Sequence, residues 1–95
     1  MTRPGDAARL IAWVEGRVQG VGFRWWVRAR ALERGLAGWA ENLVDGRVKV
    51  VAEGPSEDCD ELLALLGGGS TPGWVRQVTH RWEHASGRLC GFTER

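Results

Sequence analysis

The sequence of 95 residues has no tyrosine, two cysteines, three prolines and a net charge of only +1. No segment approaches the ~20 consecutive apolar residues of a membrane-spanning helix, and the first residues lack the apolar core of an export signal. We therefore expect a cytoplasmic protein that does not associate with membranes. The small net charge also argues against a domain that binds nucleic acid by neutralising phosphates.

The two cysteines, Cys59 and Cys90, do not have the spacing of metal ligands, and in the cytoplasm we expect both to be free thiols. Neither is followed by an arginine at the spacing that cysteine-dependent phosphatases use. The acidic run 57–61 does not predict a metal site either, because consecutive residues of a helix point in different directions. The sequence therefore predicts no metal and no cofactor.

The chain is long enough for one domain and too short for two. We expect this domain to span residues 9–95, preceded by a flexible lead-in at residues 1–8. Its apolar share of 43% and charged share of 26% are ordinary for a globular domain.

Apolar periodicity and turn residues predict seven elements in this domain. The expected strands are 9–15, 36–44, 48–53, 75–84 and a short 89–92, and the expected helices are 23–34 and 57–66. Gly35 is expected to end the first helix, and Ser56 to cap the second. Asp45-Gly46 predicts a type I′ hairpin between the second and third strands.

This order is β-α-β-β-α-β with a short extra strand, which is typical of the ferredoxin-like split βαβ arrangement. We therefore predict an α+β fold in which two helices cover one face of an antiparallel sheet. In this fold the first and third strands are neighbours. Asn42, at the end of the second strand, should then lie close to the loop between Gly16 and Gly22.

That loop has three glycines in seven positions and leads directly into the first helix. Free N–H groups and the helix dipole make such a junction an anion site, commonly for phosphate. Arg24 lies in the first helical turn, where a cation costs ~0.3–1 kcal/mol. An anion between the guanidinium and the positive end of the helix would offset this cost, and a guanidinium can bind two phosphate oxygens at once. Taken alone, the pattern fits equally well a plain turn followed by a solvated arginine.

Two longer motifs favour the anion site over the plain turn. The segment from Gly16 to Arg24 reads G-R-V-Q-G-V-G-F-R, and the segment from Gly38 to Gly54 has Asn42 before the hairpin and a glycine after the third strand. Both resemble the two signatures of the acylphosphatase family, and the resemblance extends over residues 9–93.

The resemblance implies hydrolysis of an acyl phosphate to a carboxylate and inorganic phosphate, without a metal and without a phosphoenzyme. Arg24 would hold the phosphate, Asn42 would orient the attacking water, and the phosphate itself would act as base. The implied substrate-binding residues are Arg17, Val18, Gln19, Gly20, Val21, Gly22 and Phe23. We expect a monomer whose partner is this small-molecule substrate.

One position departs from the family pattern, because Glu41 stands where a basic or small residue usually precedes the asparagine. Adjacent residues of a strand point to opposite faces, so Glu41 should point away from Asn42. Its charge would then weaken the attraction of an anionic substrate only slightly.

The six tryptophans are a further unusual feature. We expect Trp13 and Trp39 in or near the core and Trp74 and Trp82 as packing residues on or under the sheet. Trp25 follows Arg24 and is a candidate for the mouth of the site. A platform that stacks bases is the alternative use of such residues.

Three other functions are weighed against this one. The N-terminal domain of a larger carbamoyl-transferring maturation protein carries the same signatures, but no zinc-type C-x₂-C motif follows here, which favours a free-standing enzyme. RNA-recognition domains share the element order but stack bases on aromatic residues of the third strand, and residues 47–52 contain none. Arg24 and Asn42 are both present, which argues against a family member that has lost catalysis.

Overall fold

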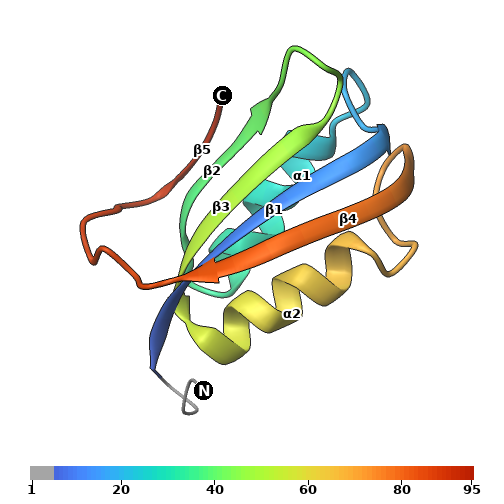
Figure 1. Cartoon of the computed structure of the whole chain (residues 1–95). Coiled ribbons are helices and arrows are strands. Elements are labelled where there is room, and N and C mark those ends of the chain that lie inside the picture. The colour runs from blue at the N-terminus through green and yellow to red at the C-terminus, as the bar shows by residue number, and fades with distance from the viewer. Residues whose placement is uncertain (1–5) are drawn as a thin grey trace.

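The structure, a computed structural model, describes residues 6–95 and consists of a sheet with two helices on one face (Figure 1). The elements are β1 (Ala7–Arg17), α1 (Phe23–Glu33), β2 (Ala37–Asn42), β3 (Val48–Pro55), α2 (Ser56–Leu66), β4 (Trp74–Glu83) and β5 (Phe92–Glu94). The predicted α+β ferredoxin-like class is confirmed. β1 begins two residues before its expected start, and the rest of the predicted lead-in falls mostly on residues 1–5, outside the described residues.

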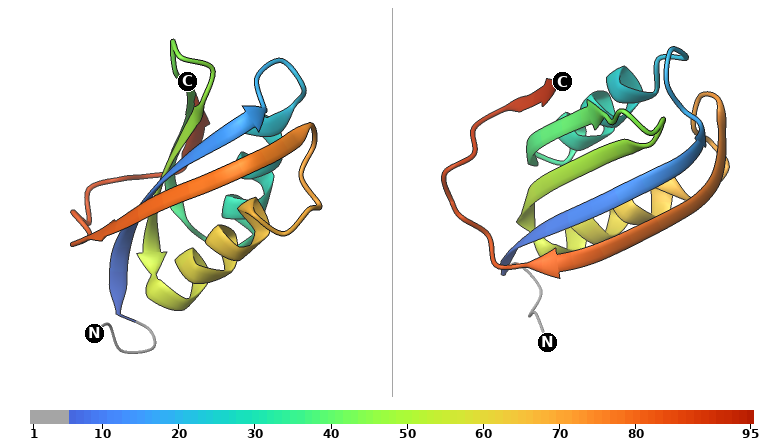
Figure 2. Two further views of the ribbon diagram at one scale, coloured as in Figure 1. Left: turned by 45° about the vertical axis from the view of Figure 1, so that its right-hand side comes forward. Right: turned by 45° about the horizontal axis from the view of Figure 1, so that its top comes forward.

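The sheet has the strand order β4-β1-β3-β2-β5. Its first four strands pair antiparallel, as expected, and Val14 near the end of β1 lies opposite Val48 at the start of β3. β5 instead pairs parallel to β2. It also begins later than the predicted strand 89–92, because residues 84–91 form the crossover from one edge of the sheet to the other (Figure 2).

The main core lies between the helices and the sheet, since α1 packs against β2 and β5 while α2 packs against β1 and β3. The buried faces of the two helices are Phe23, Trp26, Val27 and Ala31 on α1 and Cys59, Leu62 and Leu66 on α2. Both cysteines are free, as predicted. Burial is the main reason that the pKa of the Cys59 thiol is raised to about 11, so this thiol is a packing group.

The hairpin between β2 and β3 differs from its prediction. A type I′ turn needs a positive φ at both central residues, yet only glycines have positive φ among the described residues, and Gly46 has φ 95°. Instead, the Leu43 N–H donates to the Arg47 carbonyl at 2.8 Å and closes a three-residue loop. Gly46 then occupies the left-handed position of this loop, which leaves Asp45 in an ordinary conformation.

Of the two predictions for helix ends, that for Gly35 is confirmed and that for Ser56 is wrong. Gly35 follows α1 with φ 67°, as its predicted role at the end of this helix requires. The predicted cap Ser56 is instead the first residue of α2, and Pro55 occupies the cap position without a side-chain hydrogen bond. The Ser56 N–H donates to the Asp6 carbonyl at 2.7 Å, so the strand pairing of β1 and β3 brings a backbone acceptor to this end of the helix.

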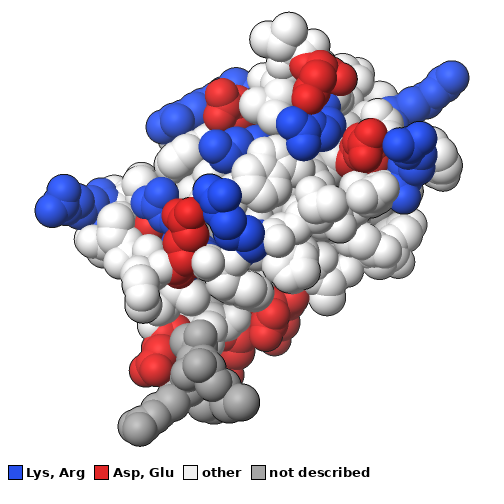
Figure 3. All heavy atoms as spheres, viewed as in Figure 1, with Lys and Arg blue, Asp and Glu red and all other residues white. Residues whose placement is uncertain are grey.

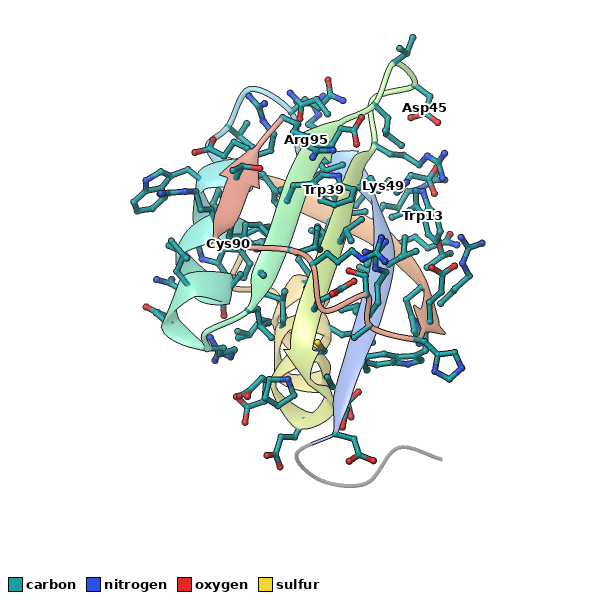
Figure 4. All side chains as sticks on the ribbon, turned by 90° about the vertical axis from the view of Figure 1, so that its left-hand side faces the viewer. Trp13, Trp39, Asp45, Lys49, Cys90 and Arg95 are labelled. Atoms are coloured by element: carbon teal, nitrogen blue, oxygen red, sulfur yellow. The ribbon has the colours of Figure 1, made fainter. Side chains whose placement is uncertain are left out.

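Four tryptophans lie away from the main core. Trp13 and Trp39 are partly exposed on the face of the sheet opposite the helices, where the Arg95 guanidinium stacks 4.0 Å from the Trp39 ring (Figure 4). Trp74 is 59% exposed, so its predicted packing role is wrong, whereas Trp82 is 40% exposed and packs edge-on against His80, with the ring centres 6.3 Å apart. Both belong to β4, an edge strand of which only Val75 and Val78 are partly buried against the core.

The Glu53 side chain binds the crossover segment 84–91 to the end of β3. Its carboxylate is buried, forms an ion pair with Arg9, and accepts hydrogen bonds from the N–H groups of Ser86 at 3.0 Å and Gly87 at 3.2 Å. Burial alone would raise the pKa of Glu53, but the hydrogen bonds from Ser86, Arg9 and Gly87 outweigh it, so the pKa lies below its ordinary value.

We predict that Glu53→Gln lowers the free energy of unfolding at pH 7 by about 1–3 kcal/mol, because an amide cannot accept all of these hydrogen bonds. A lowered folded-state pKa stabilises the protein above the ordinary value of 4.5, and this contribution is lost as the pH falls through the folded value. Urea unfolding at pH 7 and pH 3 should therefore show a difference between wild type and variant that shrinks in acid. The exposed Asp60→Asn, beyond the first turn of α2, is the control, and an equal difference at both pH values would contradict the assignment.

Candidate active site

The candidate site lies at the end of the sheet where β1 leads through loop 18–22 into α1. Figure 1 shows this loop beside the β2–β3 hairpin. Gln19 joins the two, because its Nε2 donates to the carbonyls of Leu43 at 2.7 Å and Arg47 at 3.0 Å. The expected proximity of the glycine-rich loop to the end of β2 is thus present, and a glutamine side chain maintains it.

The loop turns so that its N–H groups are left without partners. Gly20 and Gly22 have φ values of 74° and 81°, which residues with side chains rarely adopt. Within residues 6–95, no protein group accepts a hydrogen bond from the N–H groups of residues 19–22. The helix begins directly afterwards, with the Trp26 N–H bonded to the Gly22 carbonyl at 3.0 Å. This combination favours an anion in front of the loop.

Arg24 is held by the far end of the chain. Its Nη1 donates to the main-chain oxygen of Arg95 at 2.6 Å, and the Asn42 N–H donates to the same oxygen at 3.1 Å. Arg95 is in turn bonded through its N–H to the Ala40 carbonyl at 2.7 Å, which continues the pairing of β5 with β2. One oxygen thus links the two residues that the sequence indicated as catalytic.

Asn42 has a buried Oδ1 without a hydrogen-bond partner among the described residues. Leaving such an acceptor unpaired costs about 1–3 kcal/mol, so the position favours a donor that is not part of the protein, such as a water molecule. The preceding Glu41 lies on the opposite face, where it accepts a hydrogen bond from Trp39 Nε1 at 3.2 Å, as the strand alternation predicted.

A hollow opens in front of the loop and is lined by Val18, Gly20, Gly22, Phe23, Arg24, Trp25 and Glu94. Of the residues that the sequence indicated, Val18, Gly20, Gly22, Phe23 and Arg24 are therefore brought together. Four are not on the lining. Arg17 is exposed at the end of β1, Gln19 points to the hairpin, Val21 is 43% exposed, and Asn42 is partly buried beside Arg95.

Trp25 and Glu94 complete the lining of the hollow. Trp25 was a candidate for the mouth of the site because it follows Arg24, and it lines the hollow with 59% of its surface exposed. Glu94 was missed, since no local pattern marks it. It reaches the hollow only because β5 pairs with β2 and places Glu94 opposite Ala40.

No set of three or more His, Cys, Asp or Glu side chains within residues 6–95 is placed to share a metal ion. Neither helix in this part of the chain has the length and hydropathy to cross a bilayer.

Comparison with known proteins decides the family. The model of the Acylphosphatase family matches residues 10–93, almost the whole described domain. The chain belongs to the acylphosphatase family. An acylphosphatase from Nocardia farcinica is 63% identical over 91 residues, which is 96% of this chain and 91% of that relative. The predicted family and enzyme class are therefore confirmed.

Solved structures agree with this acylphosphatase assignment. The crystal structure of an acylphosphatase from Bacillus subtilis has a TM-score of 0.86 and 34% identity, covering 93% of this chain and 98% of that one. HypF from T. kodakarensis has a TM-score of 0.79 and 29% identity over 93% of this chain, but the match covers only 12% of HypF. The same fold thus also occurs as a small part of a longer protein.

We predict that Gln19→Ala weakens the binding of inorganic phosphate by up to about thirtyfold, because two hydrogen bonds that orient the loop are lost and each contributes ~1 kcal/mol. Isothermal titration calorimetry measures the affinity, and the exposed Gln77→Ala on β4 is the matched control. Equal affinities of Gln19→Ala and wild type would show that the loop keeps its shape without the hairpin.

Proposed function

We propose that this protein hydrolyses acyl phosphates without a metal ion, with the phosphate bound by the loop N–H groups and Arg24 and the water oriented by Asn42. The observation that carries the proposal is the unpaired, buried Oδ1 of Asn42, a residue whose main-chain N–H donates to the same Arg95 oxygen as the guanidinium of Arg24. Membership of the acylphosphatase family supports the reaction class.

Binding would use groups that are already in place. The unpaired N–H groups of residues 19–22 and the start of α1 supply donors and a positive dipole, and Arg24 supplies a full positive charge. Phosphoryl transfer requires mainly positioning and charge stabilisation. Donors that are fixed before the substrate arrives need no reorganisation as charge develops on the phosphate oxygens.

The attacking water would donate a hydrogen bond to Asn42 Oδ1. Its oxygen adds to phosphorus while the bond from phosphorus to the acyl oxygen breaks, and the carboxylate leaves with that electron pair. An amide cannot accept the proton of the water, so we assign the proton to a phosphate oxygen of the substrate. A carboxylate is a good leaving group and needs no general acid.

We also infer that the protein works as a monomer in the cytoplasm and does not bind nucleic acid. Its two cysteines are unpaired, and Figure 3 shows basic and acidic side chains interspersed over the face of the sheet opposite the helices. Nucleic-acid binding typically uses a continuous basic surface. Sedimentation equilibrium tests the monomer, and a mass of two chains would contradict it.

We expect Arg24→Ala and Asn42→Ala each to lower kcat/KM for benzoyl phosphate by about 10²–10³. Arg24→Ala removes the charge that holds the phosphate, whereas Asn42→Ala removes the acceptor that orients the water. Phosphate release is the measurement. Arg30→Ala is the control, because Arg30 lies on the same helix but forms an ion pair with Glu33. Undiminished turnover of Asn42→Ala would refute its role.

Metal independence is tested separately. The protein after dialysis against EDTA should hydrolyse benzoyl phosphate at an unchanged rate, because Arg24 and the loop N–H groups supply the positive charge that a metal would otherwise provide. Addition of Mg²⁺ or Zn²⁺ should not raise the rate. A loss of activity on chelation that either ion restores would contradict this part of the proposal.

A further inference from the structure

We propose that Trp25 and Glu94 form the subsite for the acyl group, and that this subsite favours apolar, neutral acyl groups over those with a second negative charge. The inference rests on the proposed function, because it assigns the part of the hollow that the phosphate would leave free. Both residues line that hollow beside Arg24.

The position of the subsite follows from the geometry of the reaction. The attacking and leaving oxygens lie roughly in line on opposite sides of phosphorus. Asn42 Oδ1 is buried, so a water bound to it approaches the phosphate from the protein interior. The acyl group then points outwards, toward the exposed rim where Trp25 and Glu94 lie.

Glu94 gives this rim a negative charge. Within residues 6–95 its carboxylate forms no ion pair and accepts no hydrogen bond. A carboxylate beside a phosphate site weakens the attraction of every anionic substrate. It repels most strongly a substrate with a second negative charge on its acyl group, because that charge comes closest to it.

Trp25 gives the rim an apolar surface. It is the residue after Arg24 on α1, so the helix fixes its position relative to the guanidinium. An indole ring that is 59% exposed offers a flat face on which an aromatic acyl group buries apolar area. A small acyl group such as acetyl buries little apolar area on the ring. The ring therefore favours substrates whose acyl groups have a larger apolar area.

The charge part of the proposal is tested by comparing kcat/KM for succinyl phosphate and benzoyl phosphate. Glu94→Gln removes the charge with little change of shape. We expect it to raise the ratio of succinyl to benzoyl kcat/KM about three- to tenfold, and Glu94→Lys to raise it further. The change should shrink at 1 M salt, where the Debye length falls to about 3 Å. Glu57→Gln, an exposed carboxylate on α2, should leave the ratio unchanged.

The apolar part is tested with benzoyl phosphate and acetyl phosphate. Trp25→Ala should lower the ratio of benzoyl to acetyl kcat/KM about three- to tenfold, whereas Trp82→Ala, an exposed tryptophan on β4, should not.

The outcomes separate the subsite from the reaction itself. Unchanged ratios in Glu94→Gln and Trp25→Ala, with wild-type benzoyl phosphate hydrolysis intact, overturn the subsite and leave the proposed function standing. A wild-type protein that hydrolyses none of these substrates overturns both. Because each readout is a ratio, a general gain or loss of phosphate binding cancels.

Discussion

One main-chain oxygen, that of Arg95, connects the parts on which this site depends. It accepts hydrogen bonds from the Arg24 guanidinium and from the Asn42 N–H, and so joins the start of α1 to the end of β2. Arg95 can reach this position only because β5 pairs with β2 at the edge of the sheet. The buried carboxylate of Glu53 anchors the crossover that brings β5 there.

The site gathers features that ordinary folding rules disfavour. Arg24 places a cation at the positive end of its own helix, loop N–H groups lack acceptors, and the Asn42 oxygen is buried without a donor. We propose that a bound phosphate pairs with Arg24 and the loop N–H groups, and that a water molecule donates a hydrogen bond to the Asn42 oxygen. Local rules are often broken at functional sites for this reason, and here the exceptions are concentrated at one end of one sheet.

The face of the sheet opposite the helices is covered by arginine side chains that stack on tryptophans. Trp13 and Trp39 lie there, and the protein's own arginines cover their rings, Arg81 at 5.6 Å and Arg95 at 4.0 Å from the ring centres. Ile11 and Val51 are buried between these strands although no helix covers that face. The tryptophans therefore have a packing partner on this face, which explains their presence without a role in base stacking.

The sequence by itself determined those features that depend on residues close to one another along the chain. Alternation and helical periodicity gave the order of the elements, the glycines gave the loop, and the motif around Arg24 and Asn42 gave the family. It erred at the Ser56 cap and the last strand, where distant contacts overrule a local choice, at the hairpin, where a three-residue loop closes in place of a two-residue turn, and at the exposed Trp74. Only the tertiary structure decided that Glu94 enters the hollow and that the Arg95 oxygen holds Arg24, because both follow from the pairing of β5 with a strand some fifty residues earlier. Such pairing depends on closing a long loop across the whole sheet, and no short stretch of sequence encodes its register.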